Sequence, residues 1–210
     1  MVKKHLKILI ITSIVSLLPI LAGLILWNQL PDQIPTHWNG EGEIDGWSSK
    51  PFAVFGLPLI LLAAHWLGTF CMLADPKRQN QTGKILQISF WIVPVLSIAL
   101  SGVTYSSSMG IGVRVEVILP LLLGILFVVL GIYMPKCKQN YTIGLKLPWT
   151  LHSEENWNRT HRLAGWLWVG GGLVTMGTAF FGNVLLALVP ILLMALIPTV
   201  YSYILYRKGI

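Results

Sequence analysis

Residues 144–165 read GLKLPWTLHSEENWNRTHRLAG, and they form the most polar segment of a chain that is otherwise nearly all apolar. Pro148 restricts its own backbone and keeps Leu147 out of the helical region, so we expect the segment to begin as an extended strand. After this strand, Thr150 or Ser153 is expected to cap the N-terminus of a helix. The segment therefore predicts a break in the chain followed by a new helix.

The predicted helix carries negative charge where a helix N-terminus favours it. Glu154 and Glu155 fall in its first turn, where free backbone N–H groups and the helix dipole favour carboxylates. Side chains one turn apart then form three groups, which are Glu154 with Asn158 and Arg162, Glu155 with Arg159, and Trp157 with His161. The apolar run from Leu163 continues into a membrane span, so the charged helix is interpreted as the cytoplasmic end of that transmembrane helix. One interpretation is that the pairs only cap and solubilise this end, because exposed pairs are common and weak.

Composition independently predicts an all-α integral membrane protein. Mean hydropathy is +0.69, hydrophobic residues make up 54% and charged residues 11% of the chain, which lies outside ordinary soluble usage. Backbone polar groups must be paired within lipid, so each apolar run of about 20 residues is expected to be helical. Six such runs are predicted, at residues 8–27, 52–73, 85–105, 115–133, 163–181 and 184–206.

The basic residues predict the orientation of these spans. With the N-terminus inside, nearly all of them fall on the cytoplasmic side: Lys3, Lys4, Lys7, Lys77, Arg78, Lys84, Lys136, Lys138, Lys146, Arg159, Arg162, Arg207 and Lys208. Only Lys50 and Arg114 fall outside, and this asymmetry is typical of bacterial membrane proteins. An even number of spans then places both termini in the cytoplasm. The net charge of +7 is thus a topology signal, and we expect no direct nucleic-acid partner because no basic soluble domain is present.

Residues 30–50 form a sizeable acidic loop, which this topology places outside the cell. Prolines, including Pro35, and glycines prevent a long helix. The acidic side chains of the loop favour a cationic ligand. The candidate binding residues are Pro35, His37, Trp38, Glu41, Glu43, Asp45 and Trp47. The tryptophans also suit an aromatic belt at the membrane interface, which is the alternative role. Oxygen-bearing residues alternate from Asn39 to Asp45 as in a calcium loop, but the downstream glutamate of an EF-hand is missing.

No other residues predict a metal, a cofactor or a catalytic group. Cys71 and Cys137 lie at or near the reducing cytoplasmic side without a CxxC motif, and they are expected to be free thiols. His152 and His161 lack the spacing of a zinc site. His65 falls near mid-membrane, where we expect a histidine hydrogen-bonded to a neighbouring helix. The small residues Gly170, Gly171, Gly172 and Gly177 are expected to let helices approach closely.

The polar segment also resembles a known family. Its pattern consists of Gly144, Pro148, Trp149, Thr150, Glu154 or Glu155, Trp157, His161, Arg162 and Ala164. This pattern is similar to the signature of the SdpI family of bacterial toxin-immunity membrane proteins. The outer loop LPDQIPTHWNGEGEIDGWSSK, residues 30–50, resembles the domain of unknown function DUF1648 that often accompanies that family. We therefore divide the chain into a two-helix unit at 1–80 and an SdpI-like four-helix unit at 81–210.

The resemblance implies a multi-pass protein of the bacterial cytoplasmic membrane that protects a producer cell against a secreted peptide toxin. We expect the toxin to bind the outer loop or the outer leaflet through Trp38, Trp47 and the loop acids. The family also implies a signalling form that captures a cytoplasmic transcriptional repressor. Glu154, Trp157, His161 and Arg162 are the expected place for that contact.

Two other interpretations of the polar segment stay open. A transporter or membrane enzyme would use Glu154, Glu155, His161 and Arg162 as an acid/base pair and a cation for a phosphate or carboxylate. No nucleophile signature, phosphate loop or metal set accompanies them, so this hypothesis comes second. In the other interpretation, the segment is a folding element in which Pro148 and Trp149 set the start of the helix and the ion pairs lock a re-entrant segment.

Overall fold

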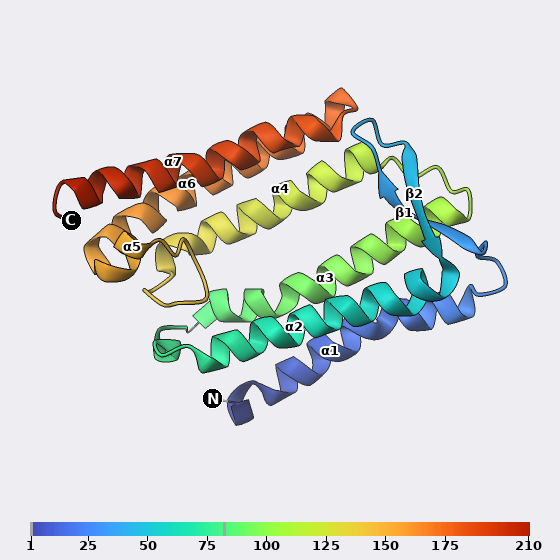
Figure 1. Ribbon diagram of the computed structural model, residues 1–210, viewed down its shortest axis with the longest axis horizontal. Coiled ribbons are helices and arrows are strands. Elements are labelled where there is room, and N and C mark those ends of the chain that lie inside the picture. The colour runs from blue at the N-terminus through green and yellow to red at the C-terminus, as the bar shows by residue number, and fades with distance from the viewer. Residues whose placement is uncertain (1, 82) are drawn as a thin grey trace. The chain divides into compact units, whose positions relative to one another are not determined.

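The computed structural model describes residues 2–81 and 83–210 (Figure 1). Within these residues, six helices are long and apolar enough to cross a membrane, which confirms the predicted helical fold with six spans. The helices are α1 (Val2–Ile25), α2 (Leu57–Ala74), α3 (Gly83–Ser108), α4 (Val115–Tyr133), α6 (Glu154–Thr178) and α7 (Leu188–Arg207). A π-helical turn at Phe52–Gly56 extends the span of α2. The side chains of Lys3 and Lys4, on which the predicted orientation partly rests, lie outside the described residues.

The chain divides into two compact units, and the first comprises Met1–Leu73 and Gln87–Val115. Buried polar groups join its helices. Thr12 Oγ1 in α1 lies 3.0 Å from His65 Nε2 in α2, which confirms that His65 bonds to a neighbouring helix. From α3, Ser97 Oγ donates to the Ser16 carbonyl at 2.9 Å and the Tyr105 hydroxyl donates to the Pro19 carbonyl at 3.2 Å. These bonds place most of α3 with α1, whereas the boundary expected at residue 80 groups it with the C-terminal spans.

The first unit also contains a β-hairpin, which was not predicted. Strand β1 (Gln33–Trp38) pairs with antiparallel strand β2 (Ile44–Ser49), and Pro35 lies opposite Trp47. The Asn39 side chain closes the turn, since its Oδ1 accepts hydrogen bonds from the backbone N–H groups of Glu41 and Glu43 at 2.9 and 3.0 Å. Residues 30–50 form no long helix, as expected, but they pair as strands rather than forming an irregular loop.

A small apolar core holds the hairpin on the helices of its own unit. Leu30 and Ile34 pack with Ala53 and Val54 at the start of the second span and with Tyr105 of α3. All five side chains are buried. The burial of such apolar side chains typically contributes about 1.5–3 kcal/mol each. This packing fixes the hairpin on the helices of its unit, so its exposed residues are held in a defined arrangement.

The second unit comprises Ala74–Leu86 and Glu116–Ile210. Glycines bring α4 and α6 into close contact: a methyl group on Gly172 would lie 2.7 Å from the Gly124 carbonyl oxygen, and one on Gly131 would lie 2.9 Å from the Gly165 carbonyl oxygen. A methyl group on Gly171 would meet Met194 of α7. The expected role in close packing is therefore confirmed for Gly171 and Gly172. Gly170 and Gly177 have open space beside them, so for these two glycines the expectation was wrong.

Candidate functional site

The polar segment folds into a short helix and the first turns of a long one. Leu147 is extended, with φ −104° and ψ 152°, and helix α5 (Pro148–His152) starts directly after it. The expectation that Pro148 and Trp149 lie in an extended strand was therefore wrong. The fixed φ of proline and its missing N–H suit the first position of a helix equally well. Ser153, rather than Thr150, caps α6, because its side chain accepts a hydrogen bond from the Asn156 N–H at 3.1 Å.

Thr150 instead holds the turn in front of α5. Its hydroxyl oxygen accepts from the Leu147 N–H at 2.9 Å and donates to the Leu145 carbonyl at 2.8 Å. The Thr150 carbonyl in turn accepts from Gln139 Nε2 at 2.8 Å. Thr150 is fully buried, so it acts on the backbone and has no access to a ligand.

Trp149 fastens α5 to α7. The indole N–H donates to the Ser202 hydroxyl at 2.8 Å, and the ring stacks on Tyr206 and meets the edge of Tyr203. Asn156, which the sequence analysis missed, makes a second buried attachment, because its side-chain N–H group donates to the carbonyls of Ser202 and Ile210 at 3.0 Å each. The sign of this in the sequence was the spacing of Asn156 and Thr160, which are one turn apart. In the structure their side chains bond to each other at 3.1 Å.

Gly144, Trp157 and His161 form a buried cluster, here called the inner cluster. The two rings stack with centroids 3.9 Å apart, which confirms the predicted pairing, and both side chains are fully buried. The Leu145 N–H donates to His161 Nε2 at 3.0 Å. Because a backbone N–H can only donate, Nε2 is unprotonated, and Nδ1–H donates to the Trp157 carbonyl at 2.8 Å. Both ring nitrogens of a neutral histidine are thus occupied.

Cys137 lies against this cluster, and its carbonyl accepts from the Trp157 indole N–H at 2.7 Å. Its thiol is buried, and burial raises the pKa of Cys137 to about 11. The reactive thiolate is therefore about one part in a thousand at pH 8. In a Cys71→Ser protein, we expect a maleimide to label Cys137 at pH 8 only after unfolding. Rapid labelling of the folded protein, measured by mass shift, would show that the cluster is open.

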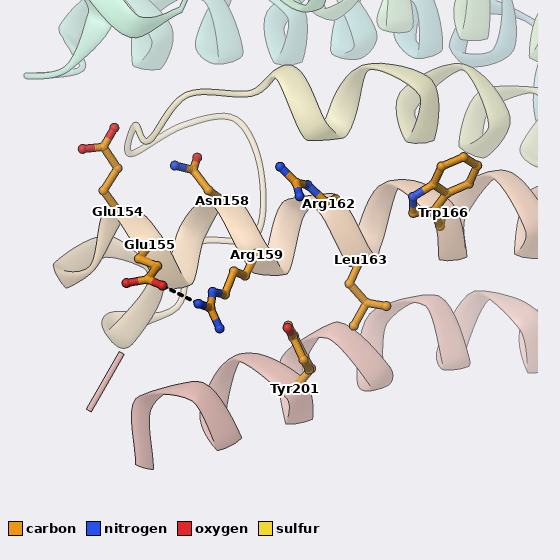
Figure 2. A pocket seen from close by; sticks show the side chains of 8 residues that line it. All are labelled: Glu154, Glu155, Asn158, Arg159, Arg162, Leu163, Trp166 and Tyr201. Atoms are coloured by element: carbon orange, nitrogen blue, oxygen red, sulfur yellow. Dashed lines mark hydrogen bonds and ion pairs between the residues drawn. The ribbon is translucent and has the colours of Figure 1, made fainter. Parts of the chain in front are cut away.

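The charged residues of the segment lie on the outside of α6 and line an open pocket of about 810 Å³. Figure 2 shows its lining in two rows, one of Glu154, Asn158, Arg162 and Trp166, and another, on the side of Tyr201 of α7, of Glu155, Arg159 and Leu163. The predicted Glu155–Arg159 ion pair is present at 2.5 Å. Glu154 and Arg162 bond to no side chain within the described part of the chain. This pocket, here called the α6 pocket, is lined by side chains of both signs of charge.

The structure thus separates the predicted site residues into two sets. Gly144, Thr150, Trp157 and His161 build the framework, with Pro148 and Trp149 at the start of α5, while Glu154, Glu155 and Arg162 face outward. His152 is also outside the pocket, where Nδ1 lies 2.6 Å from the Pro148 carbonyl. In residues 2–81 and 83–210, no three His, Cys, Asp or Glu side chains come together as a group that could hold a metal ion.

The hairpin presents the second candidate surface. Its exposed candidate residues are His37, Glu41, Glu43, Asp45 and Trp47. In strand β1, Trp38 is partly buried and Pro35 is buried. His37 Nδ1 lies 2.5 Å from Asp45 Oδ1, and the Asn39 side chain donates to Glu43 at 3.3 Å. The carboxylates therefore lie along the outer part of the hairpin together with Trp47, which is 57% exposed. This acidic and aromatic surface is here called the hairpin surface.

Comparisons with known proteins cover both candidate surfaces. Residues 136–202 match the SdpI/YfhL protein family, and residues 14–62 match the domain of unknown function DUF1648. The chain is 30% identical over 202 residues to "Immunity protein SdpI" of Bacillus subtilis (strain 168), which covers 95% of this chain and 96% of that relative. No solved structure matches the chain.

Proposed function

Because the chain belongs to the SdpI/YfhL protein family and is a multi-pass bacterial membrane protein, we propose that it is an immunity protein that protects its cell against a secreted antimicrobial peptide toxin. One observation carries this proposal. The similarity to the immunity protein of B. subtilis extends over 95% of the chain, so it includes the spans, the hairpin and the polar segment together. A match limited to the spans would support only a membrane location.

The hairpin surface is the proposed toxin contact. Exposed carboxylates of Glu41, Glu43 and Asp45 attract a cationic peptide over several ångströms and orient it. Trp47 supplies an exposed aromatic face of the type that dominates binding energy at interfaces. The predicted topology places this surface outside the cell, where a secreted toxin arrives.

The proposal also includes signalling by capture of a cytoplasmic repressor. This contact would use the side of the membrane opposite to the hairpin surface. The hairpin follows the first span and the polar segment follows the fourth, so an odd number of crossings separates them. Glu154 and Arg162 are the exposed groups available to a cytoplasmic protein. Trp157 and His161, which we also expected at this contact, are buried and would support it by holding α6 in place.

The transporter or enzyme hypothesis receives less support from the geometry. His161 would serve as the acid/base partner of a glutamate, but both of its ring nitrogens are bound within the protein. The α6 pocket contains no serine, threonine or cysteine among its lining residues. Its charges are suited to binding, and nothing in it favours a specific reaction.

A survival assay tests the function and the contact separately. A sensitive bacterium expressing the wild-type chain is challenged with the toxin-containing supernatant of a related producer, and growth is compared with the empty vector. We expect protection by the wild type and a loss of about tenfold or more in tolerated toxin for Glu41→Gln/Glu43→Gln/Asp45→Asn, because the loss of two or more charged contacts costs 1.4 kcal/mol or more. Membrane levels are checked by immunoblot.

Asp32→Asn is the control, since Asp32 is an exposed acid of the same segment that pairs with Lys50 at 3.3 Å. It should retain protection. An unprotected wild-type strain with normal membrane levels would argue against immunity to that toxin. Full protection by the triple variant would leave immunity intact and would refute the hairpin contact.

A further inference from the structure

The α6 pocket continues into an apolar groove between α6 and α7. Leu163 and Tyr201 line both hollows. The groove has a volume of about 340 Å³, and its other lining residues are Leu196, Ile197, Val200 and Ile204. A ligand that fills both parts must therefore have a charged end and a hydrocarbon end.

Charge changes in a fixed order along α6. Glu154 and Glu155 come first, Arg159 and Arg162 follow one and two turns later, and the apolar groove begins at Leu163. Eight residues of helix separate Glu154 from Arg162, which is about 12 Å along the axis and within the combined reach of two long side chains and a headgroup. The order from outside to inside is thus carboxylate, guanidinium, hydrocarbon.

The aromatic residues mark the depth of the pocket in the membrane. Trp166 is 76% exposed one turn beyond Arg162, where the helix becomes apolar. Tryptophan and tyrosine are enriched at the level of lipid headgroups. A Trp166 at this level would place Arg162 at the height of lipid phosphates and the apolar groove at the height of the acyl chains.

We propose that the α6 pocket and the adjoining groove bind one phospholipid with a zwitterionic ethanolamine headgroup. Arg162, which bonds to no side chain in the described part of the chain, binds the phosphate as guanidinium groups commonly do. Glu154 binds the ammonium group, and an acyl chain lies along Ile197 and Val200. The order of charge along α6 matches the order of groups in this lipid.

The charge balance distinguishes this lipid from an anionic one. Two carboxylates and two guanidinium groups line the pocket, so it has no excess positive charge to attract a net anion. A glycerol headgroup would also leave Glu154 without a cationic partner. We therefore expect a preference for phosphatidylethanolamine over phosphatidylglycerol.

Thermal unfolding of the purified full-length protein in detergent tests the proposal, with short-chain phosphatidylethanolamine or phosphatidylglycerol added. Phosphatidylethanolamine at about ten times its Kd should raise the Tm by about 3 °C or more, and phosphatidylglycerol should raise it less. Arg162→Gln should abolish the shift, and Glu154→Gln should remove the preference between the two lipids. Arg78→Gln is the matched control, because Arg78 is an exposed arginine of the same unit outside the pocket.

Ile197→Trp provides a second test, since it fills the apolar groove without changing charge, and it should reduce the phosphatidylethanolamine shift. Equal shifts with both lipids, or a larger shift with phosphatidylglycerol, would overturn the headgroup assignment. An undiminished phosphatidylethanolamine shift in both Arg162→Gln and Ile197→Trp would overturn the site itself.

Discussion

Gly144→Ala is expected to lower the free energy of unfolding by about 3 kcal/mol, because a strained backbone and an overfilled core add together. Gly144 has φ +113°, a conformation that side-chain-bearing residues rarely adopt. A methyl group there would also lie 2.4 Å from His161 Nε2 and 3.1 Å from the Trp157 ring. His161 cannot move aside without breaking the bonds of both ring nitrogens. The measurements are the Tm of the purified protein and its level in the membrane.

Gly182→Ala separates the two causes. Gly182 also has a positive φ, of +67°, and it belongs to the same unit, but a methyl group there meets nothing within 4 Å. It should cost about 1–2 kcal/mol from the backbone alone. Similar losses in the two variants would show that the inner cluster tolerates the methyl group and that the close packing of Gly144 has no special role.

The membrane spans were predictable from sequence because lipid leaves the backbone few choices. An apolar run of sufficient length must satisfy its polar groups internally, so length and hydropathy alone locate the helices. Local patterns on a helix were also predictable, because helix geometry brings together residues that are close in the sequence. The Ser153 cap, the Glu155–Arg159 pair and the Trp157–His161 stack each depend on residues three or four positions apart.

The hairpin was not predictable in this way because strand pairing depends on distant residues. Pro35 and Gly46 give β1 and β2 the composition of a loop, and Ile34 is the main apolar residue that fixes β1 to the helices. Its partners Val54 and Tyr105 lie 20 and 71 residues further along the chain. No periodicity within residues 30–50 contains that information.

The same limit explains why the polar segment could not be divided into framework and pocket residues from sequence. His161 and Arg162 are adjacent and equally polar, yet one is fully buried and the other is exposed. What decides this is the neighbouring 137–147 loop, whose backbone supplies partners for Thr150, Trp157 and His161. The conformation of that loop depends in turn on an aspartate more than 60 residues earlier.

Asp75 is that aspartate, and it joins two loops of the second unit. Its carboxyl group is buried and accepts four hydrogen bonds. Within its own loop the donors are the Lys77 N–H at 2.7 Å and Gln81 Nε2 at 2.6 Å. From the second loop they are the Tyr141 N–H and the Thr142 hydroxyl, each at 2.8 Å. This junction was not predicted from the sequence, because a single aspartate has no local pattern.

Asp75→Ala should therefore be among the most destabilising changes in the chain, by about 3–5 kcal/mol, since it leaves several buried donors unpaired at once. Asp75→Asn should cost less, because its side-chain oxygen still accepts from part of the set. Thermal unfolding measures the loss, and limited proteolysis should show earlier cleavage in residues 137–147 as that loop separates. Asp32→Ala is the control, because the Asp32 carboxyl group is fully exposed. If Asp75→Ala unfolded at the same temperature as Asp32→Ala, the two loops would have to be held together by other contacts, and the support that the 137–147 loop gives to His161 could not depend on Asp75.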